Sequence, residues 1–579
     1  MAVENLITEH IDIWTSAVKT KSTSGRGSSN KLELYGVKKL RELILELAVR
    51  GKLVPQDPND EPASVLLERI AQEKAQLVKE KKIKKPRKYE PIDDNSLPFN
   101  IPSSWKWARI EDLGHDLGQK KPDKTFTYVD VGSINKELGY IDEPSILEHS
   151  EAPSRARKLV QKNTVIYSTV RPYLLNIAVI DRDFNPEPIA STAFAIIHPL
   201  SGISSSYIYR YLRSPSFIEY VESVQTGIAY PAINDKQFFF GLIPVPPSAE
   251  QHRIVAKVDE LMTLCDQLEQ QTEASIEAHQ VLLTTLLDTL TNSVDADELM
   301  QNWARISEHF DTLFTTEESI DQLKQTILQL AVMGKLVPQD PTDEPASELL
   351  KRITEEKAQL VKENKIKKQK ALPPISEDEK PFELPSGWEW CRLGQIGYDL
   401  GGGTPSKSNS KYWDGEIPWV SPKDMKVDFI ASAIDTVTEK AIKETTIKLI
   451  PKNSLLMVVR GMILAHSFPV ALTNKDVVIN QDMKALVFSN IDPHYLLTVM
   501  KATKTTFTDL VDRSSHGTCK LISEKLWNVT LAIPPLNEQK KINMMLEQIM
   551  DICEQLKQGI RKKYQNQLHL TDTIVEQAV

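Results

Sequence analysis

One stretch of eight residues constrains this chain more than any other, because it occurs twice. Residues 51–58 (GKLVPQDP) return unchanged as residues 334–341. The same offset relates residues 40–49 (LRELILELAV) to residues 323–332 (LKQTILQLAV), and the DEPAS and KAQLVKE segments that follow also recur. Repetition on this scale indicates that one structural unit is present twice. The sequence therefore predicts two similar halves.

The repeated segments are predicted to be helical. Residues 40–48 carry apolar side chains at helical spacing, and Gly51 and Pro55 end that helix. A second helix is expected to begin near Pro62, because proline suits the first turn of a helix.

Two longer helices are predicted from heptad spacing after the double prolines Pro246-Pro247 and Pro534-Pro535. Steps of four and three residues are typical of a coiled-coil seam. We expect two antiparallel helices of about 40 residues, each about 60 Å long, whose seams bury each other. The first seam is Ile254, Val258, Leu261, Cys265, Leu268, Thr272, Ser275, His279, Leu282 and Leu286; the second is Ile542, Leu546, Ile549, Cys553, Leu556 and Ile560.

Between these helical parts the sequence has short β-rich stretches separated by Gly, Pro and Asn, a pattern typical of mixed α/β domains. The interiors of the two mixed domains do not resemble each other in sequence. We expect an α+β protein with an internal pseudo-twofold repeat. Its five regions are an N-terminal helical region with the first repeat copy (1–96), a first mixed domain (97–247), a central helical spacer with the second copy (248–380), a second mixed domain (381–535) and a C-terminal coiled-coil helix (536–579).

The composition sets limits on the location and partners of the protein. The chain has 579 residues and a net charge of −9, whereas a basic domain is typical of nucleic-acid binding. Residues 97–247 are nevertheless near neutral, with 15 Lys and Arg against 16 Asp and Glu, and residues 382–535 have 17 against 16. We read no membrane span and no secretory signal. The four scattered cysteines form no CxxC pair, so neither a metal site nor a disulfide framework is expected, and a cytoplasmic location fits.

The repeat, the PPSAEQHRI and PPLNEQKKI helix starts and the tandem unrelated domains together resemble the specificity subunit of a type I restriction–modification enzyme. The opening of the second domain, residues 401–408 (GGGTPSKS) followed by YW and IPWV, is similar to the opening of target-recognition domains in that family. The resemblance covers essentially the whole chain.

The resemblance implies a DNA-recognition scaffold without catalytic activity. Each mixed domain would be a target-recognition domain that reads one half of a bipartite, asymmetric site in double-stranded DNA. Two methyltransferase subunits would dock on the repeated helical surfaces, and restriction subunits would join them. S-adenosylmethionine, ATP and Mg would be bound by those partners, with no cofactor in this chain.

Candidate DNA-binding residues lie in polar loops of the two domains. Arg and Gln can make paired hydrogen bonds to base edges, whereas single lysines more often bind phosphate. The candidates in the first domain are Lys120, Lys121, Lys124, Arg171, Tyr173, Gln225 and Tyr230. Those in the second domain are Lys407, Ser408, Lys411, Arg460, Arg513, His516 and Lys520.

Two alternative functions remain open from the sequence: an autonomous DNA methyltransferase or nuclease, and a coiled-coil adaptor that binds only protein. Against an enzyme, residues 401–408 lack the glycine that precedes the lysine of a phosphate-binding loop. No [DN]PP[YF] motif of amino-methyltransferases is present, and the neighbours Ser515 and His516 have no evident acid partner for a catalytic triad.

Overall fold

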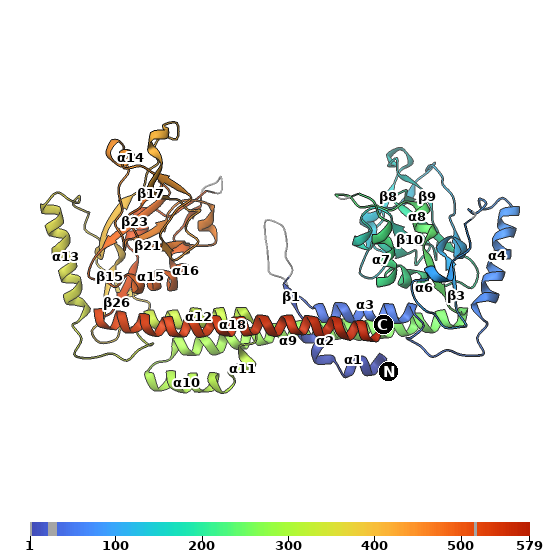
Figure 1. Cartoon of the computed structure of the whole chain (residues 1–579), viewed down its shortest axis with the longest axis horizontal. Coiled ribbons are helices and arrows are strands. Elements are labelled where there is room, and N and C mark those ends of the chain that lie inside the picture. Colours follow the sequence, from blue (N-terminus) through green and yellow to red (C-terminus); the bar gives the residue numbers. More distant parts are fainter. Residues whose placement is uncertain (1–2, 21–31, 88, 228, 514–517) are drawn as a thin grey trace. The chain divides into compact units, whose positions relative to one another are not determined.

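The computed structural model describes residues 3–20, 32–87, 89–227, 229–513 and 518–579. The chain divides into two compact units, unit 1 (Met1–Ile276 with Lys563–Val579) and unit 2 (Glu277–Lys562). Each unit contains one repeat copy, one mixed α/β domain, the beginning of one long helix and the end of the other (Figure 1). The α+β class and the duplicated plan predicted from the sequence are confirmed.

Most helices belong to one unit. Those of unit 1 are α1 (Val3–Thr8), α2 (Ile11–Ser16), α3 (Tyr35–Val49), α4 (Ala63–Lys79), α5 (Ile110–Leu113), α6 (Ser205–Leu212), α7 (Pro215–Val224) and α8 (Asp235–Phe240). Those of unit 2 are α10 (Ala296–Glu308), α11 (Phe310–Leu313), α12 (Glu317–Val332), α13 (Ala346–Lys362), α14 (Glu439–Glu444), α15 (Pro493–Ala502), α16 (Lys504–Asp509) and α17 (Ser523–Trp527). The long helices α9 (Ser248–Asn292) and α18 (Leu536–Ala578) contribute to both units.

The mixed domain of unit 1 contains two four-stranded sheets and a strand pair. One sheet has the order β11 (Ile177–Val179), β10 (Val165–Ser168), β13 (Phe194–Pro199), β4 (Gly114–His115). The other has the order β8 (Ser145–Leu147), β5 (Phe126–Val129), β12 (Pro188–Ser191), β9 (Ala156–Leu159). The pair is β3 (Lys106–Arg109) with β14 (Leu242–Val245), and β6 (Ile134–Asn135) pairs with β7 (Tyr140–Ile141). Outside the mixed domain, β1 (Lys19–Thr20) pairs with β2 (Leu32–Glu33) before α3.

The mixed domain of unit 2 follows the same plan. Its larger sheet has the order β16 (Gly397–Gly401), β23 (Met483–Phe488), β20 (Leu455–Val458), β21 (Val470–Thr473), β18 (Phe429–Ile430). Its second sheet has the order β19 (Asp435–Val437), β17 (Trp413–Val420), β22 (Val478–Ile479), and the pairs are β15 (Glu389–Arg392) with β26 (Thr530–Ile533) and β24 (Asp512–Arg513) with β25 (Cys519–Lys520).

The central strands pair alike in the two domains, although β18 of unit 2 and β9 of unit 1 have no counterpart in the other domain. Strand β10 lies between β11 and β13 with antiparallel registers, as β20 lies between β21 and β23. The second sheets each contain one parallel pair, β5 with β12 and β17 with β22. Two domains whose interior sequences do not resemble each other therefore share one topology.

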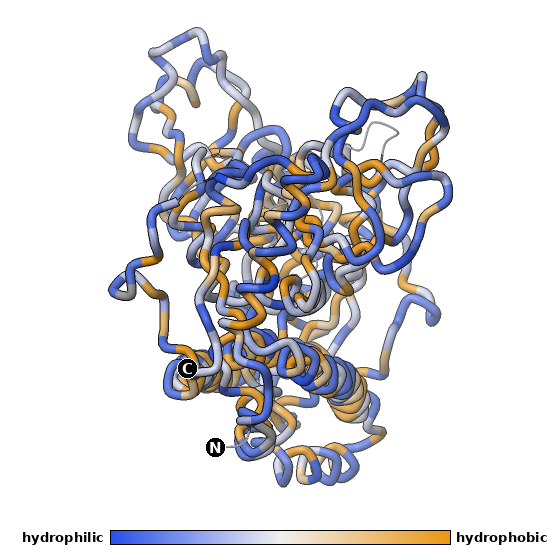
Figure 2. The backbone as a smooth tube through the Cα atoms, turned by 90° about the vertical axis from the view of Figure 1, so that its right-hand side faces the viewer, coloured by the Kyte–Doolittle hydropathy of each residue, from blue (hydrophilic) through white to orange (hydrophobic). Residues whose placement is uncertain are grey.

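The core of each unit joins its helices to its mixed domain. In unit 1, Leu40 and Ile44 of α3, Ile254 and Val258 of α9 and Tyr207 of α6 belong to one buried cluster. In Figure 2, hydrophilic segments predominate along the outer loops, whereas hydrophobic positions recur along the helices and inner strands. Helix α3 buries its apolar stripe because its leucines and isoleucines recur at helical spacing.

The beginning of each long helix uses the predicted seam. Ile254, Val258, Leu261 and Cys265 are buried and Leu268 is half-buried; Ile542, Leu546 and Cys553 are buried, and Ile549 and Leu556 are half-buried. These residues pack against the repeat helices, because the same clusters contain residues of α3 and α12. Each cluster also contains a residue from the end of the other long helix, Ile574 in unit 1 and Leu283 in unit 2.

The second half of the α9 seam differs from the prediction. Ser275 is exposed and Leu282 is 50% exposed, whereas Ile276 is half-buried and Leu283, Leu287 and Leu290 are buried. The predicted seam therefore fails at Ser275 and Leu282, while the predicted residues His279 and Leu286 are half-buried. Ion pairs show the antiparallel packing of α12 on α18 within unit 2: Lys324 with Glu554, Asp321 with Lys557 and Glu317 with Arg561.

The repeated GKLVPQDP stretch forms an anchor for the start of each long helix. In unit 1, Trp105 Nε1 donates to Glu250 at 3.0 Å and Gln56 Nε2 donates to the same carboxylate at 2.6 Å. Gly51 has a φ of +70°, and a Cβ there would lie 2.5 Å from Pro102, so glycine is required. The stretch recurs because it fits this contact with tryptophan, glutamate and proline.

The repeated KAQLVKE segment is explained by a buried lysine. Lys74 donates to the backbone oxygens of Glu111 and Gly114, and Lys357 donates to Gly394 O at 2.8 Å. Burial lowers the pKa of both lysines. In each unit this lysine joins the second repeat helix to the mixed domain.

Candidate nucleic-acid interface

A turn at the end of strand β10 brings several predicted residues together in unit 1. Arg171 follows the strand with a φ of +49°, and its backbone N–H donates to Pro231 O at 2.8 Å. Its guanidinium lies 4.8 Å from the ring centroid of Tyr230, which is 67% exposed. Tyr173 follows on a short 3₁₀ turn and is 53% exposed. Two loops distant in sequence thus present arginine and tyrosine side chains on one surface.

The equivalent turn of unit 2 follows strand β20. Arg460 is exposed, its backbone N–H donates to Asp482 O at 3.2 Å, and it forms a bridge with Lys520. Gly461 has a φ of +129° and donates to Cys519 O at 3.0 Å. Arg513 donates to Ala465 O at the end of the same turn. The predicted residues Arg460, Arg513 and Lys520 are therefore gathered around one turn.

The backbone hydrogen bonds fix the correspondence between the two turns. The backbone N–H of Arg171 donates to Pro231 O shortly before α8, as that of Gly461 donates to Cys519 O shortly before α17. Arg171 and Gly461 both have a positive φ. Arg460 then corresponds to Val170, the residue before Arg171. Each domain therefore places one arginine on this turn, at positions that differ by one residue.

The early-loop lysines of unit 1 lie apart from this turn. Lys120 pairs with Asp123 and Glu187, both at 3.0 Å, so its charge is locally compensated. Its backbone N–H donates to Arg157 O, which attaches the loop next to β9 in the second sheet. Lys121 and Lys124 are exposed.

The early loop of unit 2 leads back to the arginine turn. Lys407, Ser408 and Lys411 are exposed, and Ser408 Oγ lies 2.8 Å from Ser406 Oγ. Nearby, Thr404 Oγ1 donates to Gln481 Oε1, and Gly403 N donates to Ile479 O. Because Asp482 O accepts from Arg460 N, the early loop and the arginine turn are joined through residues 479–482.

Two further candidates, Gln225 and His516, do not belong to either arginine turn as the structure describes it. Gln225 ends α7, and its side-chain Oε1 is shielded from solvent with no hydrogen-bond partner among the described residues. His516 lies outside the described residues, as does Ser515. The predicted role of each in DNA binding stays a prediction.

The sequence analysis missed the apolar residues of the two turns. Leu174 is 39% exposed, Met462 65% and Ile463 43%. A signal was present, because RPYLL at residues 171–175 and RGMIL at residues 460–464 both place two apolar residues soon after an arginine. Leucine and isoleucine are common in cores, so only the structure identifies them as exposed.

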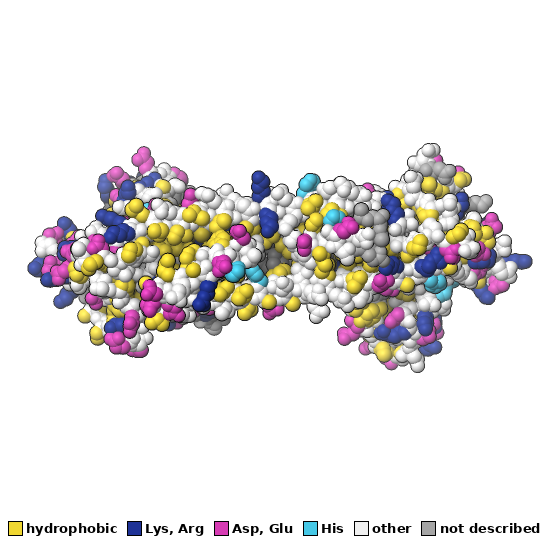
Figure 3. Space-filling view, turned by 90° about the horizontal axis from the view of Figure 1, so that it is seen from below, with side chains coloured by type: hydrophobic (Ala, Val, Ile, Leu, Met, Phe, Trp, Pro, Cys, Tyr) yellow, Lys and Arg dark blue, Asp and Glu magenta, His cyan; other side chains and the backbone are white. Residues whose placement is uncertain are grey.

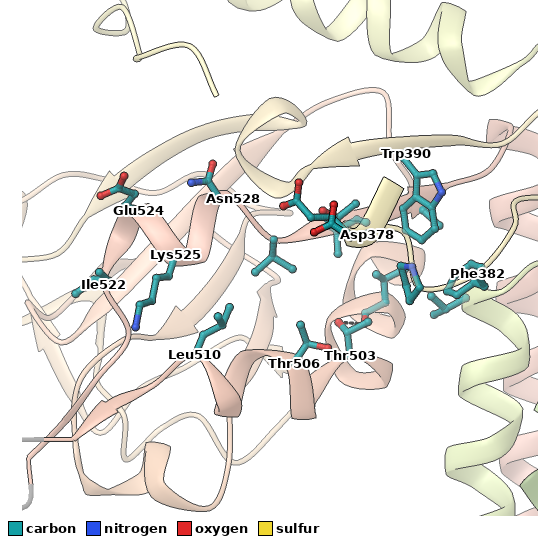
Figure 4. A pocket seen from close by; sticks show the side chains of 18 residues that line it. Asp378, Phe382, Trp390, Thr503, Thr506, Leu510, Ile522, Glu524, Lys525 and Asn528 are labelled. Carbon is teal, nitrogen blue, oxygen red and sulfur yellow. Dashed lines mark hydrogen bonds between the residues drawn. The ribbon is translucent and has the colours of Figure 1, made fainter. Parts of the chain in front are cut away.

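A cavity of about 700 Å³ opens in unit 2. Figure 4 shows Trp390 and Phe382 on one side and Leu510, Ile522 and Lys525 on another. Its rim carries Asp378, Glu379 and Glu524. Carboxylates repel DNA phosphates, so this cavity is a poor site for the nucleic-acid backbone.

At one wall of the cavity, unit 2 has a smaller residue where unit 1 has a tyrosine. Tyr207 and Tyr495 donate to Pro244 O and Ala532 O at matching strand positions, which makes Val499 the counterpart of Tyr211. Tyr211 donates to Leu242 O, and Leu242 matches Thr530, a residue that lines the cavity. In unit 1 the tyrosine ring fills the corresponding space.

The described part of the chain contains no group of three or more His, Cys, Asp or Glu side chains that could hold a metal ion. All four cysteines are buried, and burial raises the pKa of Cys265 to about 11 and that of Cys391 to about 12. None of the described helices combines the length and apolarity that a bilayer crossing requires.

Comparison with known proteins defines the class. A family model described as a type I restriction modification DNA specificity domain matches residues 102–278 and 385–565. The chain is 41% identical to the specificity subunit of type I restriction enzyme EcoAI of Escherichia coli and 41% identical to that of EcoEI, each over 100% of both chains. A solved HsdS subunit from Thermoanaerobacter tengcongensis is 22% identical, with a TM-score of 0.43 over 83% of this chain and 98% of that chain.

The two matched domains make this a DNA-specificity protein rather than a catalytic one. The chain belongs to the specificity subunits of type I restriction–modification enzymes. It contributes two target-recognition domains to such a system, and the predicted family and function are confirmed.

Proposed function

We propose that the two mixed domains each read one half of a bipartite, asymmetric site in double-stranded DNA, through the turns that carry Arg171 and Arg460. The observation that carries this proposal is the common topology of the two domains, which places an arginine on the same turn within different local sequences. One topology gives two comparable DNA-facing turns, and different side chains on them give different half-sites.

Affinity and base recognition are divided among the candidate residues. Exposed lysines such as Lys121, Lys124 and Lys407 suit phosphate contacts, which supply much of the binding free energy. Arg171 and Arg460 suit paired hydrogen bonds to guanine. Because both domains are near neutral, we propose that partner subunits supply part of the electrostatic affinity.

The helical parts are proposed to dock two methyltransferase subunits, with restriction subunits added to that complex. S-adenosylmethionine, ATP and Mg would be bound by these partners, in a cytoplasmic assembly. Two observations support docking on the helices: the repeat anchor is present in both units, and the helices of unit 2 expose Val281 (62%), Met300 (65%) and Met544 (64%). Figure 3 shows hydrophobic side chains between charged ones on the helical face.

Genome-wide mapping of methyladenine tests this proposal. Cells would express this chain with its methyltransferase partner, and cells with the partner alone would be the control. Methylation of one bipartite motif only when both proteins are present is the expected result. Methylation without this chain, or no motif despite a formed complex, would contradict the proposal.

A further inference from the structure

Both arginine turns expose apolar side chains, and the correspondence of Gly461 with Arg171 matches Ile463 to Tyr173. In unit 1 these are Tyr173 (53% exposed) and Leu174 (39%), and in unit 2 Met462 (65%) and Ile463 (43%). Single exposed hydrophobic residues are ordinary on protein surfaces. A pair at corresponding turns of two domains with unrelated interior sequences, next to an arginine each time, requires a common cause.

The turn of unit 1 is held in an unfavourable conformation. Arg171 and Leu175, at its two ends, have φ values of +49° and +51°. A bulky residue in the left-handed region costs about 1–3 kcal/mol and persists where the surroundings determine it, which is frequent at binding sites. The bridge between Val170 and Ala232, the bond from Arg171 N to Pro231 O and the contact with Tyr230 hold it here.

The turn of unit 2 is held by a comparable set of bonds. Gly461, with a φ of +129°, supplies the conformation without a side chain. Gly461 N bonds to Cys519 O, Leu464 N bonds to Gly461 O at 3.2 Å, and Arg460 N bonds to Asp482 O. The exposed apolar pair is therefore displayed on a turn that is fixed to one other loop in unit 1 (residues 230–232) and to two in unit 2.

We infer that these two turns place their apolar side chains against the bases of the DNA, so that Tyr173 and Leu174, and Met462 and Ile463, are specificity-determining residues. The inference rests on the proposed function and adds the mode of recognition. Leucine, methionine and isoleucine side chains contact thymine methyl groups or enter between base steps, and they have no donor for a phosphate; the ring of Tyr173 can make the same apolar contacts. The neighbouring arginine makes the paired hydrogen bonds to guanine proposed above.

Base contacts and phosphate contacts have different effects on measured DNA binding. Loss of a phosphate contact weakens binding to every DNA sequence and lowers the salt dependence of binding, whereas loss of a base contact acts at one position of the site. The apolar pairs are therefore expected to affect specificity and leave the salt dependence unchanged.

The experiment uses the full chain in complex with its methyltransferase partner, after the motif has been mapped. The variants are Tyr173→Ser with Leu174→Ser, and Met462→Ser with Ile463→Ser. Matched controls are Leu138→Ser and Ile434→Ser, whose side chains are 65% and 73% exposed in the same two domains. Binding to the mapped site and to unrelated DNA is measured across a range of salt concentrations.

Each double variant is expected to lower the ratio of specific to non-specific affinity by about ten-fold, the size of one lost base contact. Mapping should show relaxed selection in one half-site only, and the controls should retain the original motif. The side chains are exposed, so folding should be unaffected; the single variants Leu174→Ser and Ile463→Ser repeat the test if a double variant fails to form the complex.

An unchanged motif and an unchanged affinity ratio in both double variants would overturn the inference while the proposed function stands. A uniform loss with a reduced salt dependence would also overturn it, because the turns would then contact only the backbone. If the wild-type complex methylates no bipartite motif, it is the proposed function that fails.

Discussion

The indole Nε1 of Trp105 donates a hydrogen bond to the buried carboxylate of Glu250 at 3.0 Å, and this contact ties the first strand of a mixed domain to the start of a long helix. The same bond, also at 3.0 Å, joins Trp388 to Glu538 in unit 2. A buried carboxylate requires donors, and the repeated glutamine supplies the second one in each unit. The anchor therefore explains why the repeat is retained where the surrounding domains differ.

Trp105→Phe is expected to lower the free energy of unfolding by about 2 kcal/mol, because it leaves a buried carboxylate short of a donor. Urea unfolding followed by circular dichroism measures the change. Trp107→Phe is the matched control: it lies two residues away, and its Nε1 is buried without a hydrogen-bond partner among the described residues. Equal losses in the two variants would show that the tryptophan–glutamate bond contributes nothing.

The anchor glutamates predict a pH dependence of stability. Burial raises the pKa of Glu250 and Glu538 above the ordinary 4.5, although their hydrogen bonds oppose this. A carboxyl group with a raised pKa binds its proton more tightly in the folded chain, so its favourable contribution is lost as pH rises from 4.5 through the folded pKa.

Replacing both glutamates by glutamine should therefore flatten the fall in stability just above pH 4.5. Urea midpoints of the wild type and of the Glu250→Gln, Glu538→Gln variant, measured from pH 4.5 to neutrality, test this. Glu379 has the opposite sign, because Arg392 holds its pKa at about 2 and its contribution is lost only as pH falls. A difference between the two proteins that does not vary with pH would contradict the prediction.

Because of the cavity in unit 2, exchanging the matching residues Tyr211 and Val499 should change the free energy of unfolding by different amounts in the two units. Tyr211→Val should cost about 3 kcal/mol, since it removes a buried ring and leaves a void. Val499→Tyr should stay within about 1 kcal/mol of the wild type, because the existing cavity can take the ring. Urea unfolding compares the two, and an equally large loss in Val499→Tyr would show that the cavity cannot accommodate it.

Arg171→Ala and Arg460→Ala should each weaken recognition of one half-site by about 1–3 kcal/mol. Arg171→Lys keeps the charge but loses the planar guanidinium over Tyr230. Compared with Arg171→Ala, it should therefore recover more of the affinity for unrelated DNA than of the specificity. Binding of the methyltransferase complex to DNA mutated in one half-site at a time provides the measurement. Effects of one variant on both half-sites would be inconsistent with separate recognition.

Exchange of residues 97–245 for the first domain of a relative should change one half-site and leave the other unchanged. The physical reason is that residues of the two mixed domains lie in separate compact units. Methyladenine mapping of the exchanged protein gives the result directly. A change in both half-sites would show that the domains do not act independently.

Local patterns in the sequence predicted the helical parts well. Helix α3 ends at Val49, just before the glycine that was expected to end it, and α4 begins directly after Pro62. The seam of α9 agrees with the prediction except at Ser275 and Leu282, because the shift that exposes Leu282 and buries Leu283 depends on which neighbours pack there. Side-chain spacing along one helix does not encode its partner.

The sequence by itself determined the duplication, the long helices, the α+β class and the family, because repeats, heptads and motifs are local or recur at a fixed offset. Only the tertiary structure decided that two dissimilar domains share one topology and that Arg171 lies over Tyr230, or Arg460 beside Lys520. Those contacts join loops about 60 residues apart in the chain, brought together by strand pairing. Pairing between distant strands is fixed by the packing of the whole core, which no local pattern records.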